Sequence, residues 1–415
     1  MRNKNNKKMK KAIVLAGGYD QIALIKELKK RGYYVYLIDY YENPPAKNYV
    51  GRHFVGSTLD LDFVRAIAKE IRPDLITTAC TDQALLTSAE ISEELGLPTY
   101  ISAETAKEVT NKSYMKKKMW EVGIPTSKYY IIKNIREIDD IEISYPVVIK
   151  PADCNSSKGV KKAQNITELI NALTNALKIS RTNTAIVEEF KHGKEFSADF
   201  YIEHGKAQLL SVTESKKIPD NGAFTIVQSV YPATTELQNR DIENIGQRIA
   251  DSFGIDNSPL LVQFIEDDGQ FFVIEFSARM GGGSKYKLIE VISGVCIMSK
   301  YVDLVTGVDS KKIEVNQSAE NIEVDYIYCK NGILESVYGI EQLLQDNTID
   351  FYFQYKMLPS KITQSLTSGD RLGGVLISGK NSIEVLQKRN KFNRIIRGIS
   401  ADGVDIVNHE IINQL

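Results

Sequence analysis

The sequence contains few cysteines, and their arrangement argues against two kinds of structural centre. The four cysteines among 415 residues form neither a CxxC pair nor a Cys/His spacing of the kind that binds metal. This pattern indicates neither a disulfide framework nor a zinc site, and it is typical of a protein in a reducing compartment. We therefore expect a cytoplasmic location. The cysteines are Cys80, Cys154, Cys296 and Cys329.

Long apolar runs and an excess of either charge are also missing. No apolar run approaches the roughly 20 residues that a membrane span requires. The run at residues 12–16 is too short for the core of a signal peptide. The formal net charge of −1 gives no electrostatic reason to expect nucleic acid or an anionic membrane as a partner. We expect residues 1–9 to be a disordered basic tail and the partners to be small molecules.

The chain is long enough for several domains. At 415 residues, of which 43% are hydrophobic, it should divide into two or three well-packed domains. Strand and helix patterns alternate near the start, which predicts a small parallel sheet wrapped by helices. From residue 145 onward short strands dominate, which predicts an antiparallel sheet with helices packed on one side. The predicted units after the tail are an α/β domain at 10–110, a central subdomain at 111–190, a second subdomain at 191–308 and a β-rich region at 309–415.

A dinucleotide-binding motif is incomplete in the first domain. Gly17 and Gly18 follow the first predicted strand, and Asp39 ends the second, where a ribose-binding acid would lie. The full GxGxxG is absent, so the two glycines more simply permit a tight turn from strand to helix. An NAD-dependent oxidoreductase stays open as an alternative.

One helix is predicted over residues 105–123, because Gly123 followed by Pro125 is typical of a helix stop. The three lysines at 116–118 lie in this helix. Three consecutive residues cannot all point one way on a helix. We therefore interpret them as a solvated face.

The most informative stretch is 260–283, where two apolar runs flank an Asp-Gly pair at Asp268 and Gly269. Such a pair between apolar runs is a strong hairpin signal. If the connecting loop takes residues 268–270, Gln263 lies directly opposite Glu275 on the same face of the sheet.

Ser277 should project from the face that carries Gln263 and Glu275. A carboxylate, an amide and a hydroxyl on an otherwise apolar hairpin, followed by Arg279 and three glycines, indicate a Mg²⁺–phosphate site. A solvated hairpin whose polar face meets water is the alternative.

A loop of small polar residues follows Lys150 at the end of another predicted strand. The backbone N–H groups of such a loop, which includes Ser156, Ser157 and Gly159, can bind phosphate oxygens, and Lys150 supplies a point charge. The Walker A pattern is missing. An ordinary hairpin loop with an incidental lysine stays open.

Acidic residues flank the next turn. Glu188 ends an apolar strand and Glu195 begins the following one. Acids at the edge of a sheet crevice can accept hydrogen bonds from an adenine amino group or from ribose hydroxyls, and the backbone around Glu189 and Phe190 can present a base-pairing edge. Glu189 could equally be a surface charge. We interpret His192 as a loop residue without a catalytic role.

Together these segments resemble the ATP-grasp family over about residues 10–310. The similarity is greatest to carboxylate-amine ligases of the L-amino acid ligase kind, and it extends to carbamoyl phosphate synthetase. It implies an ATP-grasp fold with an N-terminal parallel α/β domain, a small central α+β domain and an antiparallel-sheet domain. The segments that carry it are Lys112, 148–151, 187–190 with Glu195, 262–264 and 273–279.

The resemblance implies nucleotide-binding roles at the matching positions. Lys112 and Lys150 would contact the phosphates of ATP, and residues 155–159 would close over them. Glu188 and the Phe190 backbone would hold adenine, and Glu195 would accept from the ribose.

The resemblance also implies a metal site and a catalytic arginine. Gln263 and Glu275 would bind Mg²⁺, with Mn²⁺ as an option, and Arg279 would stabilise the transferred phosphoryl group. The family usually has asparagine where this chain has Ser277. A second metal ion at Ser277 is therefore left open.

The resulting hypothesis is an ATP-dependent ligase that activates a carboxylate as an acyl phosphate and joins it to an amine, releasing ADP and phosphate. A carboxylate needs this activation because oxide is a poor leaving group. The alternatives are a bicarbonate-activating enzyme of the carboxylase or carbamoyl phosphate type and a catalytically degenerate ATP-binding protein. The identity of both substrates, the role of residues 309–415 and the existence of a homodimer stay open.

Overall fold

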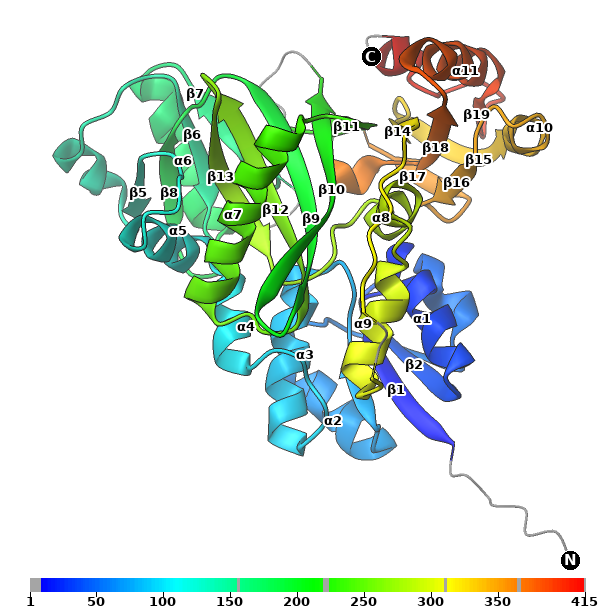
Figure 1. Ribbon diagram of the computed structural model, residues 1–415, viewed down its shortest axis with the longest axis horizontal. Coiled ribbons are helices and arrows are strands. Elements are labelled where there is room, and N and C mark those ends of the chain that lie inside the picture. Colours follow the sequence, from blue (N-terminus) through cyan, green and yellow to red (C-terminus); the bar gives the residue numbers. More distant parts are fainter. Residues whose placement is uncertain (1–8, 155–156, 219–223, 310–311, 364–366, 414–415) are drawn as a thin grey trace, which may run out of the picture.

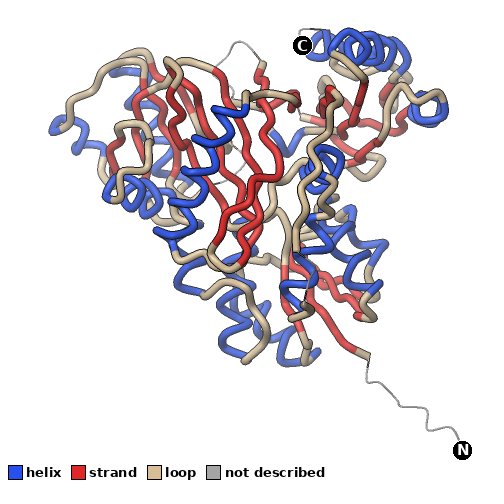
Figure 2. The backbone as a smooth tube through the Cα atoms, in the orientation of Figure 1, coloured by secondary structure: helices blue, strands red, loops and turns tan. Residues whose placement is uncertain are grey.

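The computed structural model describes residues 9–154, 157–218, 224–309, 312–363 and 367–413 (Figure 1). Except for Met9, the predicted tail lies outside the described residues. Within the described ranges the strands form four sheets, and the backbone tube shows helices against each of the larger ones (Figure 2).

The N-terminal unit is a parallel sheet in the order β3-β2-β1-β4, as predicted, although strand β3 had no clear signal in the sequence. The strands are β1 (Lys10–Leu15), β2 (Tyr33–Asp39), β3 (Arg52–Val55) and β4 (Leu75–Thr77). The helices are α1 (Asp20–Lys30), η1 (Pro45–Tyr49), α2 (Leu61–Ile71) and α3 (Asp82–Leu95).

The glycine turn after β1 is stabilised by the side chain of Asp39. The Asp39 carboxylate accepts hydrogen bonds from the Gly17 N–H and the Tyr41 N–H, each at 2.7 Å. A Cβ atom at Gly17 would come within 2.7 Å of Pro44 Cβ. Asp39 therefore holds the turn, and this observation weighs against a ribose-binding role.

The single helix predicted over 105–123 is wrong. Two helices occupy this region, α4 (Ala103–Val109) and α5 (Lys112–Glu121). The break occurs because the Asn111 side chain caps α5, accepting from the Ser113 and Tyr114 N–H groups at 3.0 and 3.3 Å. The cap places Lys112 in the first turn of α5.

A lobe with its own four-stranded antiparallel sheet follows, in the order β5-β8-β6-β7. Helix α6 (Ile166–Ile179) covers one face of this sheet, and η2 (Ile135–Asp140) lies beside it. The strands are β5 (Tyr129–Ile132), β6 (Val147–Pro151), β7 (Lys161–Ala163) and β8 (Ala185–Glu189).

The largest sheet has eight strands in the order β13-β12-β9-β10-β11-β14-β18-β16. Its strands are β9 (Lys194–Glu203), β10 (Lys206–Lys217), β11 (Ile226–Tyr231), β12 (Ser258–Asp267), β13 (Gln270–Ser277), β14 (Asn321–Ile327), β16 (Phe351–Gln354) and β18 (Gly373–Gly379). The helices against it are α7 (Glu236–Phe253), α8 (Lys285–Ser293) and α9 (Ile297–Thr306).

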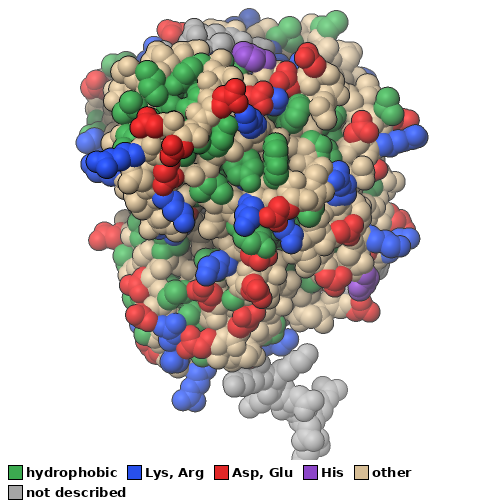
Figure 3. Space-filling model, turned by 90° about the vertical axis from the view of Figure 1, so that its left-hand side faces the viewer, with side chains coloured by type: hydrophobic (Ala, Val, Ile, Leu, Met, Phe, Trp, Pro, Cys, Tyr) green, Lys and Arg blue, Asp and Glu red, His purple; other side chains and the backbone are tan. Residues whose placement is uncertain are grey.

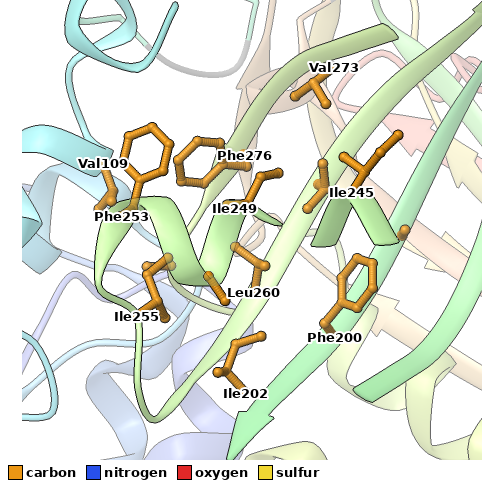
Figure 4. Packing of buried hydrophobic residues seen from close by; sticks show 14 of the residues in the cluster. Val109, Phe200, Ile202, Ile245, Ile249, Phe253, Ile255, Leu260, Val273 and Phe276 are labelled. Atoms are coloured by element: carbon orange, nitrogen blue, oxygen red, sulfur yellow. The ribbon is translucent and has the colours of Figure 1, made fainter. Parts of the chain in front are cut away.

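Helices cover both faces of this sheet, so the prediction of helices on one side is wrong. Phe200 packs with Ile249 of α7, whereas the adjacent Tyr201 packs in the cluster that contains Ile289 of α8. Successive side chains of a strand point to opposite faces. Figure 4 shows the α7 side of this core, with Phe253 against Phe276.

The last hundred residues continue the large sheet. Strands β14, β18 and β16 extend it beyond β11. A small sheet in the order β17-β15-β19 packs beside them (Figure 1). Its strands are β15 (Gly332–Tyr338), β17 (Ser360–Ile362) and β19 (Arg397–Ser400), with α10 (Ile340–Gln345), η3 (Ser368–Asp370), α11 (Ser382–Ile395) and α12 (His409–Asn413) around them.

The surface carries both charges. On the face shown in Figure 3, basic and acidic side chains are interspersed with apolar ones. Within the described residues, no helix has the length and apolar character needed to cross a bilayer.

Candidate active site

A cleft of about 800 Å³ lies between the four-stranded lobe and the eight-stranded sheet. Its size is that of a site for a small organic molecule or cofactor. Many of the residues singled out in the sequence line it, although they come from segments far apart in the chain. These are Lys112, Lys150, Ser157, Glu188, Glu189, Phe190, Glu195, Gln263 and Glu275.

The predicted pairing of Gln263 with Glu275 is confirmed, but it results from a two-residue turn and a bulge and not from the predicted three-residue loop. The turn has two residues, Asp268 and Gly269, both with positive φ, so Asp267 pairs with Gln270. A bulge at Ile274 then shifts the register by one residue.

The bulge decides which side of the sheet Glu275 occupies. Without it, Glu275 would lie opposite Val262, which is fully buried in the core behind the sheet. With it, Ile274 and Glu275 both line the cleft. A two-residue turn suits Asp-Gly because both central residues of such a turn need positive φ.

Glu275 is the acid at the centre of the site. Its Oε2 lies 3.2 Å from Lys112 Nζ, and Lys112 Nζ also donates to the Cys154 carbonyl oxygen at 2.8 Å. Burial raises the pKa of Glu275, but the positive charges of Lys112 and Lys150 outweigh it and leave the pKa below its usual value. Glu275 is therefore ionised at neutral pH, as a metal ligand must be.

The oxygen donors around Glu275 suit Mg²⁺ bound together with a nucleotide. The Gln263 amide lies opposite Glu275 on the same wall. In the described ranges, no group of three or more His, Cys, Asp or Glu side chains is arranged to hold a metal ion by itself. Mg²⁺ commonly takes one or two protein carboxylates and completes its shell with phosphates and water. One carboxylate and one amide fit that requirement.

Two lysines share the Glu188 carboxylate. Lys150 Nζ lies 2.6 Å from Glu188 Oε1, and Lys116 Nζ lies 3.3 Å from Glu188 Oε2. The interpretation of residues 116–118 as a solvated face is therefore wrong at Lys116, which is only 1% exposed and also donates to Thr126 Oγ1 at 2.6 Å. Burial lowers the pKa of Lys116 to about 8, despite the opposing effect of Glu188. The available signal was its spacing of four residues from Lys112, which puts both on one helix face.

Replacing Lys116 by Met is expected to weaken binding of MgATP about tenfold, or ~1.4 kcal/mol. Lys150 would then be the only lysine that neutralises Glu188, so its own positive charge would attract phosphates less strongly. In the wild type the same loss should appear as the pH rises through about 8, because Lys116 gives up its proton there. Calorimetric titration with MgATP from pH 7 to 9 measures both effects.

Lys117→Met is the matched control, because Lys117 is the exposed neighbour on the same helix. It should change neither the affinity nor its dependence on pH. Wild-type affinity that stays constant up to pH 9, with a K116M protein that binds equally well, would contradict this role of Lys116.

The proposed adenine contacts are only partly available. Glu188 is occupied by the two lysines, so it is better placed to orient Lys150 than to hold a base. The Phe190 N–H already donates to the Pro146 carbonyl oxygen at 3.2 Å, and the Glu189 N–H to Lys128 at 2.9 Å. These donors are therefore not free for a base.

The other end of the cleft combines an aromatic ring with charged groups. Lys162 Nζ lies 3.7 Å from the centre of the Phe190 ring, and His192 packs edge-on against the same ring. Glu195 lines the cleft and forms an ion pair with Lys217.

The phosphate loop is described only in part. Ser157 lines the cleft with a positive φ, and Ser156 lies outside the described residues. Gly159 is not among the lining residues that the described chain contributes. A Cβ atom there would come within 2.2 Å of Ile179 Cδ1, so this glycine serves the packing of the loop.

Arg279 and Ser277 lie beside the cleft and are not among its described lining residues. Arg279 Nε donates to Asp82 Oδ1 at 2.8 Å, and Nη2 bonds the other carboxylate oxygen. The Ser277 hydroxyl lies against the same carboxylate. Burial raises the pKa of Asp82, but Arg279 outweighs this effect and lowers it. Sequence reasoning missed Asp82, because no local pattern links it to a partner 197 residues away.

Comparison with known proteins supports this interpretation. Residues 143–287 match the family model of the ATP-grasp domain. The formate-dependent phosphoribosylglycinamide formyltransferase of Prochlorococcus marinus is 30% identical over 186 residues, which is 44% of this chain and 47% of that protein. The carbamoyl phosphate synthase large chain of Thermotoga neapolitana is 25% identical over 285 residues, 64% of this chain and 26% of that one. The matched region thus spans half or less of the length of these two relatives.

Solved structures share the fold over nearly the whole chain. An L-amino acid ligase from Bacillus licheniformis has a TM-score of 0.77 and 21% identity, covering 94% of this chain and 98% of that one. The biotin carboxylase domain of the Hydrogenobacter thermophilus 2-oxoglutarate carboxylase, solved with MgADP and bicarbonate, has a TM-score of 0.78 and 18% identity, covering 97% and 93%. Residues 143–287 therefore match the ATP-grasp domain, and the chain shares its fold with these two solved structures.

Proposed function

We propose that the protein is an ATP-dependent ligase that activates a carboxylate as an acyl phosphate and couples it to an amine. The observation that carries this proposal is the convergence of Lys112, Lys150, Gln263 and Glu275 on one cleft of nucleotide size. Small-molecule carboxylate and amine substrates and a cytoplasmic setting belong to the same proposal.

The proposed reaction has two steps. A carboxylate oxygen bonds to the γ-phosphorus of ATP as the bond from that phosphorus to the β–γ bridging oxygen breaks, and ADP leaves with the electron pair. The amine nitrogen then attacks the acyl carbon and phosphate leaves, while the nitrogen gives up a proton.

The residues of this chain would bind and orient the reactants. Lys112 and Lys150 would hold phosphate oxygens, with Lys150 kept in place by Glu188. When bound, Mg²⁺ would be held by Glu275 and Gln263 and would neutralise the triphosphate. Arg279, whose orientation Asp82 fixes, would stabilise negative charge on the transferred phosphoryl group.

Phosphate release with ATP and Mg²⁺ tests the proposal. Each L-amino acid is supplied alone and in pairs, and bicarbonate is supplied in a separate arm. Release that depends on a pair, with a condensed product detected by mass spectrometry, is the expected result. Release with bicarbonate alone would replace the ligase with a bicarbonate-activating enzyme. ATP binding without turnover in any arm would indicate a degenerate ATP-binding protein.

A further inference from the structure

Arg371 is a buried arginine at the entrance to β18. Its side chain lies over the Tyr326 ring, with the guanidinium carbon 3.5 Å from the ring centre, and the residue is 8% exposed. Nε donates to Tyr328 Oη at 3.0 Å, and Nη2 donates to the Ile226 carbonyl oxygen at 2.9 Å. All three contacts are with uncharged groups.

Arg371 forms no direct ion pair within the described chain, although burial raises the pKa of the Asp20 carboxyl and the charge of Arg371 acts against that larger effect. Arg389 is equally buried and pairs with Glu323 at 3.3 Å, and Arg279 pairs with Asp82. Arg371 has no carboxylate within 4.0 Å among the described residues, and its Nη1 has no hydrogen-bond partner there. An unpaired buried charge is costly. A ligand carboxylate at Nη1 would supply the direct counter-charge that the described residues do not.

Nη1 lies beside Gly283, whose φ of +73° is in the left-handed region that favours glycine. A Cβ atom at Gly283 would lie 2.9 Å from Arg371 Nη1 and 2.9 Å from Tyr326 Oη. The loop is held in place by Asp20, which accepts from the Gly283 and Ser284 N–H groups at 3.0 and 2.9 Å.

This loop directly follows the catalytic segment. Gly283 comes four residues after Arg279, and Ile226, whose carbonyl oxygen Arg371 holds, lines the nucleotide cleft. Arg371 itself does not line that cleft. It therefore lies near the site of the chemistry but outside the space that the nucleotide would fill.

We propose that Arg371 binds a substrate carboxylate beside Gly283, and that this carboxylate is not the one that becomes phosphorylated. The inference rests on the proposed ligase function. The reacting carboxylate must reach the γ-phosphate near Glu275, so the group held by Arg371 stays unreacted and the product keeps a free carboxylate. One positive charge with one open pair of N–H donors matches a carboxylate better than a phosphate dianion. The substrate class is accordingly an amino acid or a dicarboxylate.

Paired substrates test the proposal. Phosphate release is measured with each productive L-amino acid as amine substrate and with its carboxamide, which keeps the amine but removes the charge. The wild type should prefer the acid about 100-fold in kcat/KM, the effect of losing a hydrogen-bonded buried charge pair. Arg371→Gln should bring the ratio close to one while the KM for ATP is unchanged. If the free carboxylate belongs to the activated substrate, dicarboxylic acids and their half-amides give the same comparison.

Two further variants separate recognition from folding. Gly283→Ala fills the space beside Nη1 without changing any charge, and it should also abolish the preference for the acid. Arg389→Gln removes the other buried arginine of this region and should keep the preference. An R371Q protein that retains turnover and the wild-type ratio would overturn the inference and leave the ligase function intact.

A binding measurement covers the case in which the wild type shows no turnover. Melting temperatures are then measured with a non-hydrolysable ATP analogue and each L-amino acid, its carboxamide or ribose 5-phosphate. A shift caused by acids but not by carboxamides, and lost in R371Q, supports the inference even though the ligase function has failed. Equal shifts for acid and carboxamide, no shift at all, or an Arg371-dependent shift with ribose 5-phosphate alone, overturn it.

Discussion

Replacing Glu275 by Gln should lower ATP-dependent phosphate release by about 10²–10³-fold, as expected when one preorganised charge at the reacting phosphate is lost. The amide keeps the size of the side chain but cannot neutralise Mg²⁺ or pair with Lys112, which now lies 3.2 Å from it. Initial rates at saturating ATP and substrate, over a range of Mg²⁺ concentrations, measure the effect. Higher Mg²⁺ should recover part of the lost rate, because the defect lies in holding the metal–nucleotide complex.

The matched control is Asp268→Asn at the tip of the same hairpin. This substitution makes the same change from carboxylate to amide at an exposed position, and asparagine tolerates the positive φ found there. Its rate should equal that of the wild type. If E275Q is as active as D268N, Glu275 is not a metal ligand.

Replacing Asp82 by Asn should destabilise the protein by about 3–5 kcal/mol, because it leaves the Arg279 guanidinium buried without its direct ion-pair partner. Both side chains are only 13% exposed, and the bond between them is bidentate. Equilibrium unfolding in urea measures the change. Arg65→Gln is the control, because its ion pairs lie at the surface, where solvent screens them, and their loss should change the stability little.

The double variant D82N/R279Q separates stability from chemistry. Because the two residues are in contact, its free energy of unfolding should be lowered by much less than the sum of the single effects. Activity should not return, because in the proposed mechanism Arg279 stabilises the transferred phosphoryl group. Recovery of activity in the double variant would show that Arg279 is only a partner for Asp82.

The stability contribution of Asp82 should depend on pH in one direction. Its pKa in the folded protein is lower than its usual value of 3.8. The contribution is therefore complete above the usual pKa and is lost as the pH falls through the lowered one. The D82N protein should lack this component of acid sensitivity.

Much of the fold follows from local patterns. The periodicity of the first domain predicts its parallel sheet, and the Asp-Gly turn predicts the hairpin that carries Gln263 and Glu275. The bulge at Ile274 could not be predicted, because nothing in the alternation of apolar residues distinguishes a two-residue turn with a bulge from a three-residue loop. Either arrangement places Gln263 opposite Glu275.

The residues that sequence reasoning missed depend on contacts between distant segments. Lys116 is buried because α5 packs between the hairpin and the lobe, where Thr126 and Glu188 meet its amine. Asp82 belongs to the first turn of α3 in the N-terminal domain, and Arg371 lies just before β18 near the end of the chain. Their sequence neighbourhoods carry no motif, so the fold had to be known before their charges could be matched.

The continuity of the large sheet has a consequence for selectivity. Glu275 lies on β13 and Arg371 lies two residues before the start of β18, and unbroken backbone pairing connects these strands. Lys150, by contrast, belongs to the separate sheet of the lobe. Movement of the lobe can therefore change how the nucleotide is enclosed, but it leaves the span from Glu275 to Arg371 constant. We expect the length of the substrate molecule to decide which compounds react. A molecule that is too short to reach from Glu275 to Arg371, or too long to fit between them, is rejected however well its charges match.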